Sequence, residues 1–118
     1  MLCGLSRDPQ VGPLVVVGVG GSLAESLGGT SVTALAPLGV DEARALVHTS
    51  GPLGNALDER DQHAIADVLV ALGRLAAHRP DVAAIDINPL RVLDGSAHAL
   101  DALIVLEDTV KETQWISP

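Results

Sequence analysis

Aromatic side chains are almost absent from this sequence. Its 118 residues include one tryptophan and no phenylalanine or tyrosine. Hydrophobic residues still make up 47% of the chain, so a core can form. That core has to be built from Leu, Val, Ile and Ala, which fill space with less area each than aromatic rings do. The length and the hydrophobic content suit one domain.

Positive charge is also scarce. The formal net charge is −8, and Lys111 is the only lysine. Proteins that bind nucleic acids present clustered lysine and arginine side chains, which displace the counterions of the phosphate backbone. The sequence has no such cluster, so we expect no nucleic-acid partner.

Cys3 is the only cysteine, which excludes an internal disulfide and suits a reducing compartment. The apolar run Leu14–Gly21 is far shorter than the roughly 18 residues that indicate a membrane helix. A secretory signal is not expected either, because Arg7 is offset by Asp8 and no positive leading region remains. We therefore expect a cytoplasmic protein that does not bind membranes.

Periodicity and turn residues divide the chain into strands and helices. The clearest helix is expected at residues 61–79, where apolar residues recur at intervals of three and four and Pro80 follows. The other expected elements are strands at 1–7, 14–17, 31–35, 82–93 and 96–106, a short helix at 41–47, a loop at 50–57 and a polar tail at 107–118. This order predicts an α+β fold with a mostly antiparallel sheet and two helices.

Asp94-Gly95 is the strongest hairpin signal in the chain. A two-residue turn there pairs Leu93 with Ser96, and counting outward places Asn88 directly opposite Asp101. Asp86 points to the same face as Asn88, because side chains alternate along a strand. The count gives this face five further residues, all apolar: Leu90, Val92, Ala97, Ala99 and Leu103.

Two interpretations of these three polar residues remain open. Directly opposed side chains lie about 5 Å apart, so a carboxylate and an amide oxygen could share one Mg²⁺, which binds oxygen ligands. Alternatively, Asn88 makes a strand-end hydrogen bond before Pro89, and Asp101 acts as a cap or faces solvent. The residues alone favour neither.

Glycines follow the first strongly β-branched run. Gly18, Gly20 and Gly21 could bring backbone amides close to phosphate oxygens, although a tight turn or a bulge explains them more simply. The four histidines, His48, His63, His78 and His98, are scattered without ligand spacing, so surface or helix-end positions are expected for them.

A family resemblance emerges from several short segments that occur in one order. They are Gly4, Asp8-Pro9-x-x-Gly12-Pro13, Val17-Gly18-Val19-Gly20-Gly21 with Glu25, Leu35-Ala36-Pro37-Leu38, Asp86-Ile87-Asn88-Pro89-Leu90, and Ala99-Leu100-Asp101-Ala102. In these segments the chain resembles the ATP-grasp domain of ADP-forming acyl-CoA synthetases, with succinyl-CoA synthetase beta chains as more distant relatives. The resemblance covers about residues 2–106 and points to the carboxy-terminal lobe of that domain, which we expect at residues 1–106.

The resemblance implies a function. Asn88 and Asp101 would bind the Mg²⁺ of ATP or ADP, Asp86 would belong to the same metal signature, and Gly20 and Gly21 would border the phosphates. The family couples cleavage of an acyl-CoA thioester to nucleotide triphosphate synthesis, or the reverse, through acyl-phosphate and phosphohistidine intermediates. The chain would thus be a component of an acid-CoA ligase.

The departures from the family pattern imply an incomplete site. The amino-terminal ATP-grasp lobe, the CoA-binding domain and the phosphohistidine domain have no counterpart here. Met1 and Ala34 stand where the family has a glutamate and an arginine, and no arginine-glycine loop occurs at 51–60. We expect no activity from the chain alone and partners that supply the missing lobe and a CoA-binding subunit or domain. The alternatives are a non-catalytic regulatory or binding module, as in acetyltransferase fusions, and a decayed fragment.

Overall fold

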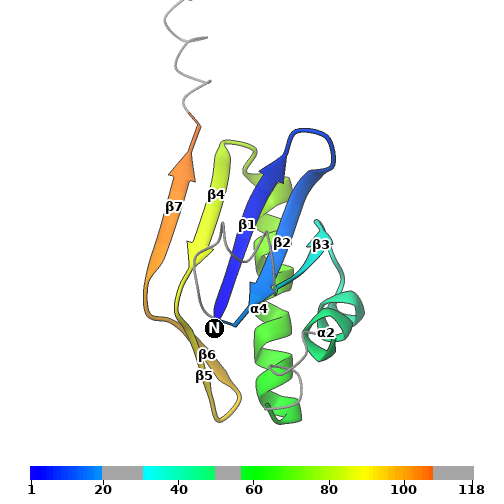
Figure 1. The fold of residues 1–118 in the computed structure, drawn as a ribbon, viewed down its shortest axis with the longest axis vertical. Coiled ribbons are helices and arrows are strands. Elements are labelled where there is room, and N and C mark those ends of the chain that lie inside the picture. The colour runs from blue at the N-terminus through cyan, green and yellow to red at the C-terminus, as the bar shows by residue number, and fades with distance from the viewer. Residues whose placement is uncertain (20–30, 50–56, 108–118) are drawn as a thin grey trace, which may run out of the picture.

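The structure is a computed structural model, and it describes residues 1–19, 31–49 and 57–107. Within these ranges the chain forms a five-stranded antiparallel sheet, a two-stranded ribbon and two helices (Figure 1). The elements are β1 (Leu2–Asp8), β2 (Gly12–Gly18), β3 (Val32–Leu35), α2 (Val40–His48), α4 (Glu59–His78), β4 (Val82–Ile87), β5 (Leu90–Leu93), β6 (Ser96–Ala99) and β7 (Ala102–Leu106). The expected α+β class is confirmed.

Strand β1 lies in the middle of the sheet. The strand order is β3-β2-β1-β4-β7, and β1 pairs antiparallel with both β2 and β4. Leu2, Cys3 and Leu5 are fully buried, as expected for a central strand. Burial raises the pKa of the Cys3 thiol to about 12, so this side chain acts as a small apolar group of the core.

The core lies between the sheet and α4. Alternate residues of the central strands, including Leu5 and Val15, pack against the apolar stripe of α4, which includes Ile65 and Leu69. Figure 1 shows α4 running behind β1 and β2. Leu, Val, Ile and Ala fill this layer with no aromatic ring, as the composition predicts.

Both helices begin at residues that hydrogen-bond the first turn. The Asp58 carboxylate accepts the Asp61 N–H at 2.8 Å, so α4 begins at Glu59, two residues before the expected start. In α2 the Glu42 side chain accepts the Gly39 N–H at 3.3 Å. Such caps satisfy amides that have no partner within a helix. Among the described residues, no helix is long and apolar enough to cross a membrane.

The two long strands expected at 82–93 and 96–106 are each interrupted. The first divides into β4 and β5 around Asn88-Pro89, and the second into β6 and β7 around Leu100-Asp101. Proline has no N–H to donate to a strand neighbour, so the ladder is weakened at this point. The expectation of continuous strands was therefore wrong, although the pairing partners are retained across the gap.

Arg7 ties the central strand to the end of α4. Its Nε donates to the Val82 carbonyl at 2.6 Å, and its Nη2 donates to the carbonyls of Ala76 at 3.0 Å and Arg79 at 3.1 Å. The last carbonyls of a helix have no partner within the helix. One side chain thus satisfies three backbone acceptors and fixes the connection between the end of α4 and the start of β4.

Replacing Arg7 by methionine should lower the free energy of unfolding by about 1–3 kcal/mol, because partly buried carbonyls lose a charged donor. Urea denaturation followed by circular dichroism measures this change. The control is Arg44→Met on the exposed surface of α2, which should change stability by less than about 0.5 kcal/mol. Equal losses in the two variants would contradict an anchoring role for Arg7.

Candidate functional site

The site is built on the hairpin between β5 and β6. Asp94 and Gly95 both have positive φ, 52° and 77°, as the favoured two-residue hairpin turn requires. Leu93 pairs with Ser96, as predicted from the sequence. The hairpin tip is also anchored to α4, because the Gly95 N–H donates to the Asp61 carboxylate at 2.7 Å.

The same register continues through the break into β4 and β7. Ile87 pairs with Ala102, and Asp86 pairs with Leu103. Between the paired segments, the Asn88 N–H donates to the Asp101 carbonyl at 3.0 Å. The predicted placement of Asn88 beside Asp101 is therefore confirmed, whereas the metal role of these residues stays a prediction.

The sequence analysis placed Asp86, Leu90 and Val92 on one face of the strand pair, and this prediction was wrong. Ile85 and Ile87 belong to the core on the α4 side, so Asp86 between them points to the other side of the sheet. Leu90 and Val92 also pack into the core. Two residues instead of one separate the core-facing Ile87 and Leu90, so the alternation shifts by one position at Asn88-Pro89.

The cause of this shift is packing against α4. The ribbon contacts α4 through β5 and β6, and its apolar residues Leu90, Val92 and Ala97 complete the core there. Burial of apolar surface outweighs a regular alternation of a few residues. As a result, the ribbon residues between these positions, Arg91, Leu93, Ser96 and His98, lie on the side away from α4.

Asp86 carries a buried oxygen without a partner. Its Oδ1 is excluded from solvent and has no hydrogen-bond partner among the residues that the structure describes. A buried polar oxygen in this condition costs free energy, so it requires an explanation such as a ligand or an ion. Asn88 follows Asp86 by two residues and lies beside Asp101 on the same strand pair. Both side chains carry an oxygen that can bind a hard cation such as Mg²⁺.

These residues cannot enclose a metal ion by themselves. The described residues contain no group of three or more His, Cys, Asp or Glu side chains placed to hold one. Mg²⁺ is commonly held by one or two carboxylates together with substrate phosphates. The arrangement fits an ion whose remaining ligands come from a bound phosphate compound. Gly20 and Gly21, expected to border phosphates, lie outside the described residues.

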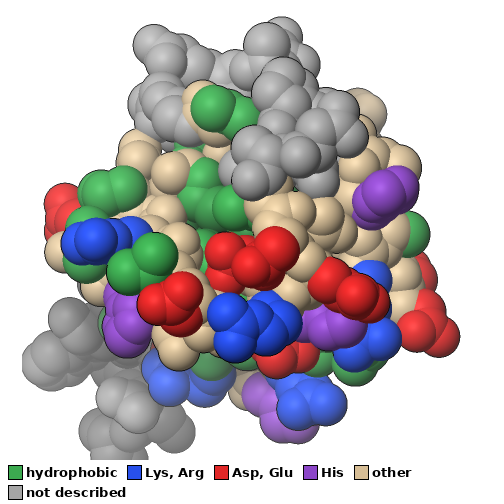
Figure 2. Space-filling view, turned by 90° about the horizontal axis from the view of Figure 1, so that it is seen from below, with side chains coloured by type: hydrophobic (Ala, Val, Ile, Leu, Met, Phe, Trp, Pro, Cys, Tyr) green, Lys and Arg blue, Asp and Glu red, His purple; other side chains and the backbone are tan. Residues whose placement is uncertain are grey.

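The register also brings together a pair that the sequence analysis missed. Arg91 lies directly opposite His98, and both are exposed. The signal was available, since the count that pairs Asn88 with Asp101 also pairs these two. Figure 2 views the molecule from the end that carries the ribbon and the start of α4, where acidic, basic and histidine side chains gather.

Comparison with known families gives one match over most of the chain. Residues 1–106 match the family model described as an ATP-grasp domain. The chain is 35% identical over 111 residues to the beta subunit of acetate–CoA ligase (ADP-forming) I from Pyrococcus furiosus, covering 90% of this chain and 47% of the relative. It is 34% identical over 116 residues to a trans-feruloyl-CoA synthase from an unidentified prokaryote, covering 91% and 16%.

Solved structures give the same picture. A dinucleotide-forming acetyl-coenzyme A synthetase 1 of Ca. Korarchaeum cryptofilum, in complex with coenzyme A and Mg-AMPPCP, matches with a TM-score of 0.74 and 30% identity. The match covers 90% of this chain and 52% of that one. The chain thus spans about half the length of the beta subunit it matches, and residues 1–106 of the chain form the part that matches the ATP-grasp domain model.

Replacing Asp86 by asparagine should raise the free energy of unfolding of the metal-free chain by about 1 kcal/mol, because a buried carboxylate oxygen without a partner is exchanged for a neutral amide of the same shape. Thermal and urea unfolding in the presence of EDTA measure the change. The control is Asp67→Asn on the exposed face of α4, which should have little effect. A clear loss of stability in Asp86→Asn would mean that the carboxylate already has a stabilising partner, and it would contradict a cation site at this residue.

Proposed function

Because this chain belongs to the ATP-grasp family, we propose that it is the carboxy-terminal lobe of the nucleotide-binding domain of an ADP-forming acyl-CoA synthetase. In this proposal Asn88 and Asp101 hold Mg²⁺ against the phosphates of ATP or ADP, and Asp86 supports them. Gly20 and Gly21 would border the same phosphates. The catalysed reaction would belong to the complete enzyme and not to this lobe alone.

The observation that carries the proposal is the buried, unpartnered Oδ1 of Asp86 next to the Asn88–Asp101 pair. Main-chain pairing fixes Asp86 opposite Leu103 and ties Asn88 to Asp101 through a 3.0 Å hydrogen bond. Strand pairing thus fixes the main chain of these residues before any ligand binds, which supports the proposal. Preorganised ligands of this kind hold a metal–phosphate complex without further ordering of the backbone.

Each residue has a distinct task in this proposal. The Asp101 carboxylate, which is exposed, provides the charged ligand, and the Asn88 side-chain oxygen provides a neutral one. Asp86 lies within the paired part of β4, two residues before Asn88, and its carboxylate adds negative charge that favours a cation beside Asn88 and Asp101. The ion, when bound, neutralises phosphate charge and fixes the orientation of the phosphates.

The lobe requires a partner to complete the site. The chain spans 47% of the beta subunit it resembles, and with a net charge of −8 it has little means of neutralising a triphosphate. Strand β7, at the edge of the sheet, exposes four consecutive apolar side chains, two on each face: Leu103, Ile104, Val105 and Leu106 are 44–63% exposed. Uncovered apolar surface of this kind favours association. We propose that a second ATP-grasp lobe and a CoA-binding subunit or domain supply the rest.

The acyl substrate is set elsewhere in this proposal. The names of the two relatives contain very different acids, acetate and ferulate. This chain is nevertheless 35% identical to the first and 34% identical to the second. A lobe shared at similar identity by both fits a task common to both reactions. Binding of the metal nucleotide is such a task, whereas selection of the acid is not.

Paramagnetic Mn²⁺ bound to the nucleotide analogue AMPPCP offers a direct test of the metal ligands. In the ¹⁵N-labelled chain, Mn²⁺ with AMPPCP at millimolar concentration should selectively broaden the amide signals of Asn88, Asp101 and their strand neighbours. Asp101→Asn should abolish the selective broadening, because the charged ligand is lost. Asp67→Asn, which makes the same charge change on an exposed part of α4, should leave it intact. Broadening that is equal in both variants, or that centres on another surface, would overturn the assignment.

The isolated chain should not bind Mg-ATP tightly. Two or three oxygen ligands on one strand pair can share an ion, but they contact neither the adenine nor most of the phosphate charge. Calorimetric titration of the 118-residue chain with Mg-ATP should give no saturable binding in the micromolar range. One-to-one binding at micromolar concentration would contradict the proposal that this chain is half of a site.

A further inference from the structure

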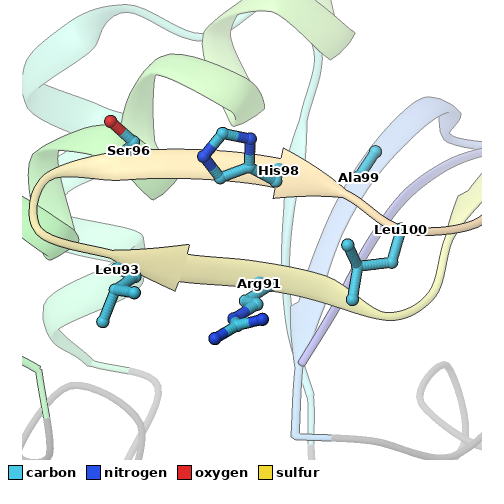
Figure 3. Close-up of a pocket in the computed structure, with 6 residues that line it drawn as sticks. All are labelled: Arg91, Leu93, Ser96, His98, Ala99 and Leu100. Carbon is cyan, nitrogen blue, oxygen red and sulfur yellow. The ribbon is translucent and has the colours of Figure 1, made fainter.

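The outer face of the ribbon contains a hollow whose lining includes an arginine and a histidine. Six residues line a space of about 570 Å³: Arg91, Leu93, Ser96, His98, Ala99 and Leu100. Figure 3 shows them on the two strands of the ribbon, with Arg91 on one strand and His98 on the other. Strand pairing fixes these two residues directly opposite each other. The hollow thus combines a permanent cation, an imidazole and a hydroxyl group in an apolar rim.

This hollow faces away from α4, as Asp86 does, and one end of it adjoins Asp101 in the chain. The shift of alternation at Asn88-Pro89 turns Arg91 away from α4, as Asp86 is turned away in β4. Leu100, at one end of the hollow, directly precedes Asp101 in the chain. Arg91 follows Asn88 by three residues, so their Cα atoms lie at most about 11 Å apart. A flexible arginine side chain can span much of such a separation.

The basic pair has no structural task of its own. Arg7 is engaged by three carbonyls, and Arg79 is paired with Asp81 at 2.8 Å. Arg91, in contrast, makes no hydrogen bond or ion pair with any described residue, and it is exposed. Arg91 therefore places an unpaired positive charge on this face of a chain with a net charge of −8, and the His98 imidazole lies opposite it on the neighbouring strand.

We infer that Arg91 and His98 form an anion subsite that binds a phosphoryl group next to the metal ligands Asn88 and Asp101. The guanidinium offers a pair of donors that matches phosphate oxygens, and the His98 ring and the Ser96 hydroxyl add further donors. The identity of the ligand rests on the proposed function, because a nucleotide complex has both a cation and phosphates. The nitrogen donors of the ribbon would thus hold a phosphate, and the oxygen ligands at the break between the ribbon and the sheet would hold the ion.

The test uses the whole ¹⁵N-labelled chain in EDTA, so that no metal takes part. Tripolyphosphate, AMPPCP and inorganic phosphate are titrated separately, at constant ionic strength. Saturable shifts are expected for the amides of Arg91, Ser96 and His98. Arg91→Gln should weaken the binding about tenfold, the usual effect of losing one charge-assisted hydrogen bond. His98→Gln should weaken it by a smaller factor.

The control is Arg44→Gln, which makes the same charge change on the exposed face of α2 and should bind like the parent chain. Equal weakening by Arg44→Gln and Arg91→Gln, or shifts outside the ribbon, would overturn the subsite. Binding of tripolyphosphate and AMPPCP without inorganic phosphate would identify the phosphate chain of a nucleotide as the source. Binding of inorganic phosphate at similar strength would identify free phosphate.

The outcome is separable from that of the proposed function. Asp101→Asn removes a negative charge near the hollow, so it should retain or strengthen the metal-free binding, although it should abolish selective Mn²⁺ broadening. Loss of the phosphate response with an intact Mn²⁺ response would remove only the anion subsite. The converse result would remove the metal assignment and leave the subsite in place.

Discussion

A single pairing register runs from the hairpin tip to the edge of the sheet, and the candidate site depends on it. The turn at Asp94-Gly95 sets the register in β5 and β6, and β4 and β7 continue it up to the shift between Val82 and Ala84. The neighbours of Asp86, Asn88, Arg91, His98 and Asp101 across the strand pair all follow from this count. A slip by one residue would exchange the two faces of the ribbon and separate Asn88 from Asp101. The 2.7 Å hydrogen bond between Gly95 and Asp61 holds the tip against α4 and opposes such a slip.

The local parts of the fold could be predicted from the sequence, and the long-range parts could not. The hairpin turn follows from two residues whose chemistry suits positive φ, and the position of α4 follows from its apolar stripe. The proximity of Asn88 and Asp101 followed by counting. The shift of face at Asn88-Pro89 was missed because it is decided by burial of Leu90 against distant residues, a contribution that alternation does not include. The bonds of Arg7 to carbonyls near residue 80 left no sequence signal, since arginine in a strand normally reads as an exposed position.

The distribution of burial suits a lobe that provides one wall of a shared site. Its most buried residues lie between the sheet and α4, where Leu5, Val15 and Ile65 are fully excluded from solvent. The ribbon and β7, in contrast, are mostly exposed. The polar groups with proposed functions lie on the ribbon, on β4 and in the segments that join the ribbon to the sheet. A rigid core thereby supports ligand groups at its edge, and the unpartnered Asp86 oxygen is held at some cost in stability. Such local cost at a functional site is common in proteins.

The central position of β1 has a consequence for the order of events during synthesis. Strand β1 leaves the ribosome before all the others, and β2 can pair with one of its edges soon afterwards. Its other edge belongs to β4, which follows more than seventy residues later. At the usual elongation rate of 5–20 residues per second, this edge waits for roughly 4 to 15 s. During that interval a fully apolar segment, Leu2 to Leu5, stands with an open strand edge, and the chain is then most accessible to chaperones and to pairing with other nascent chains.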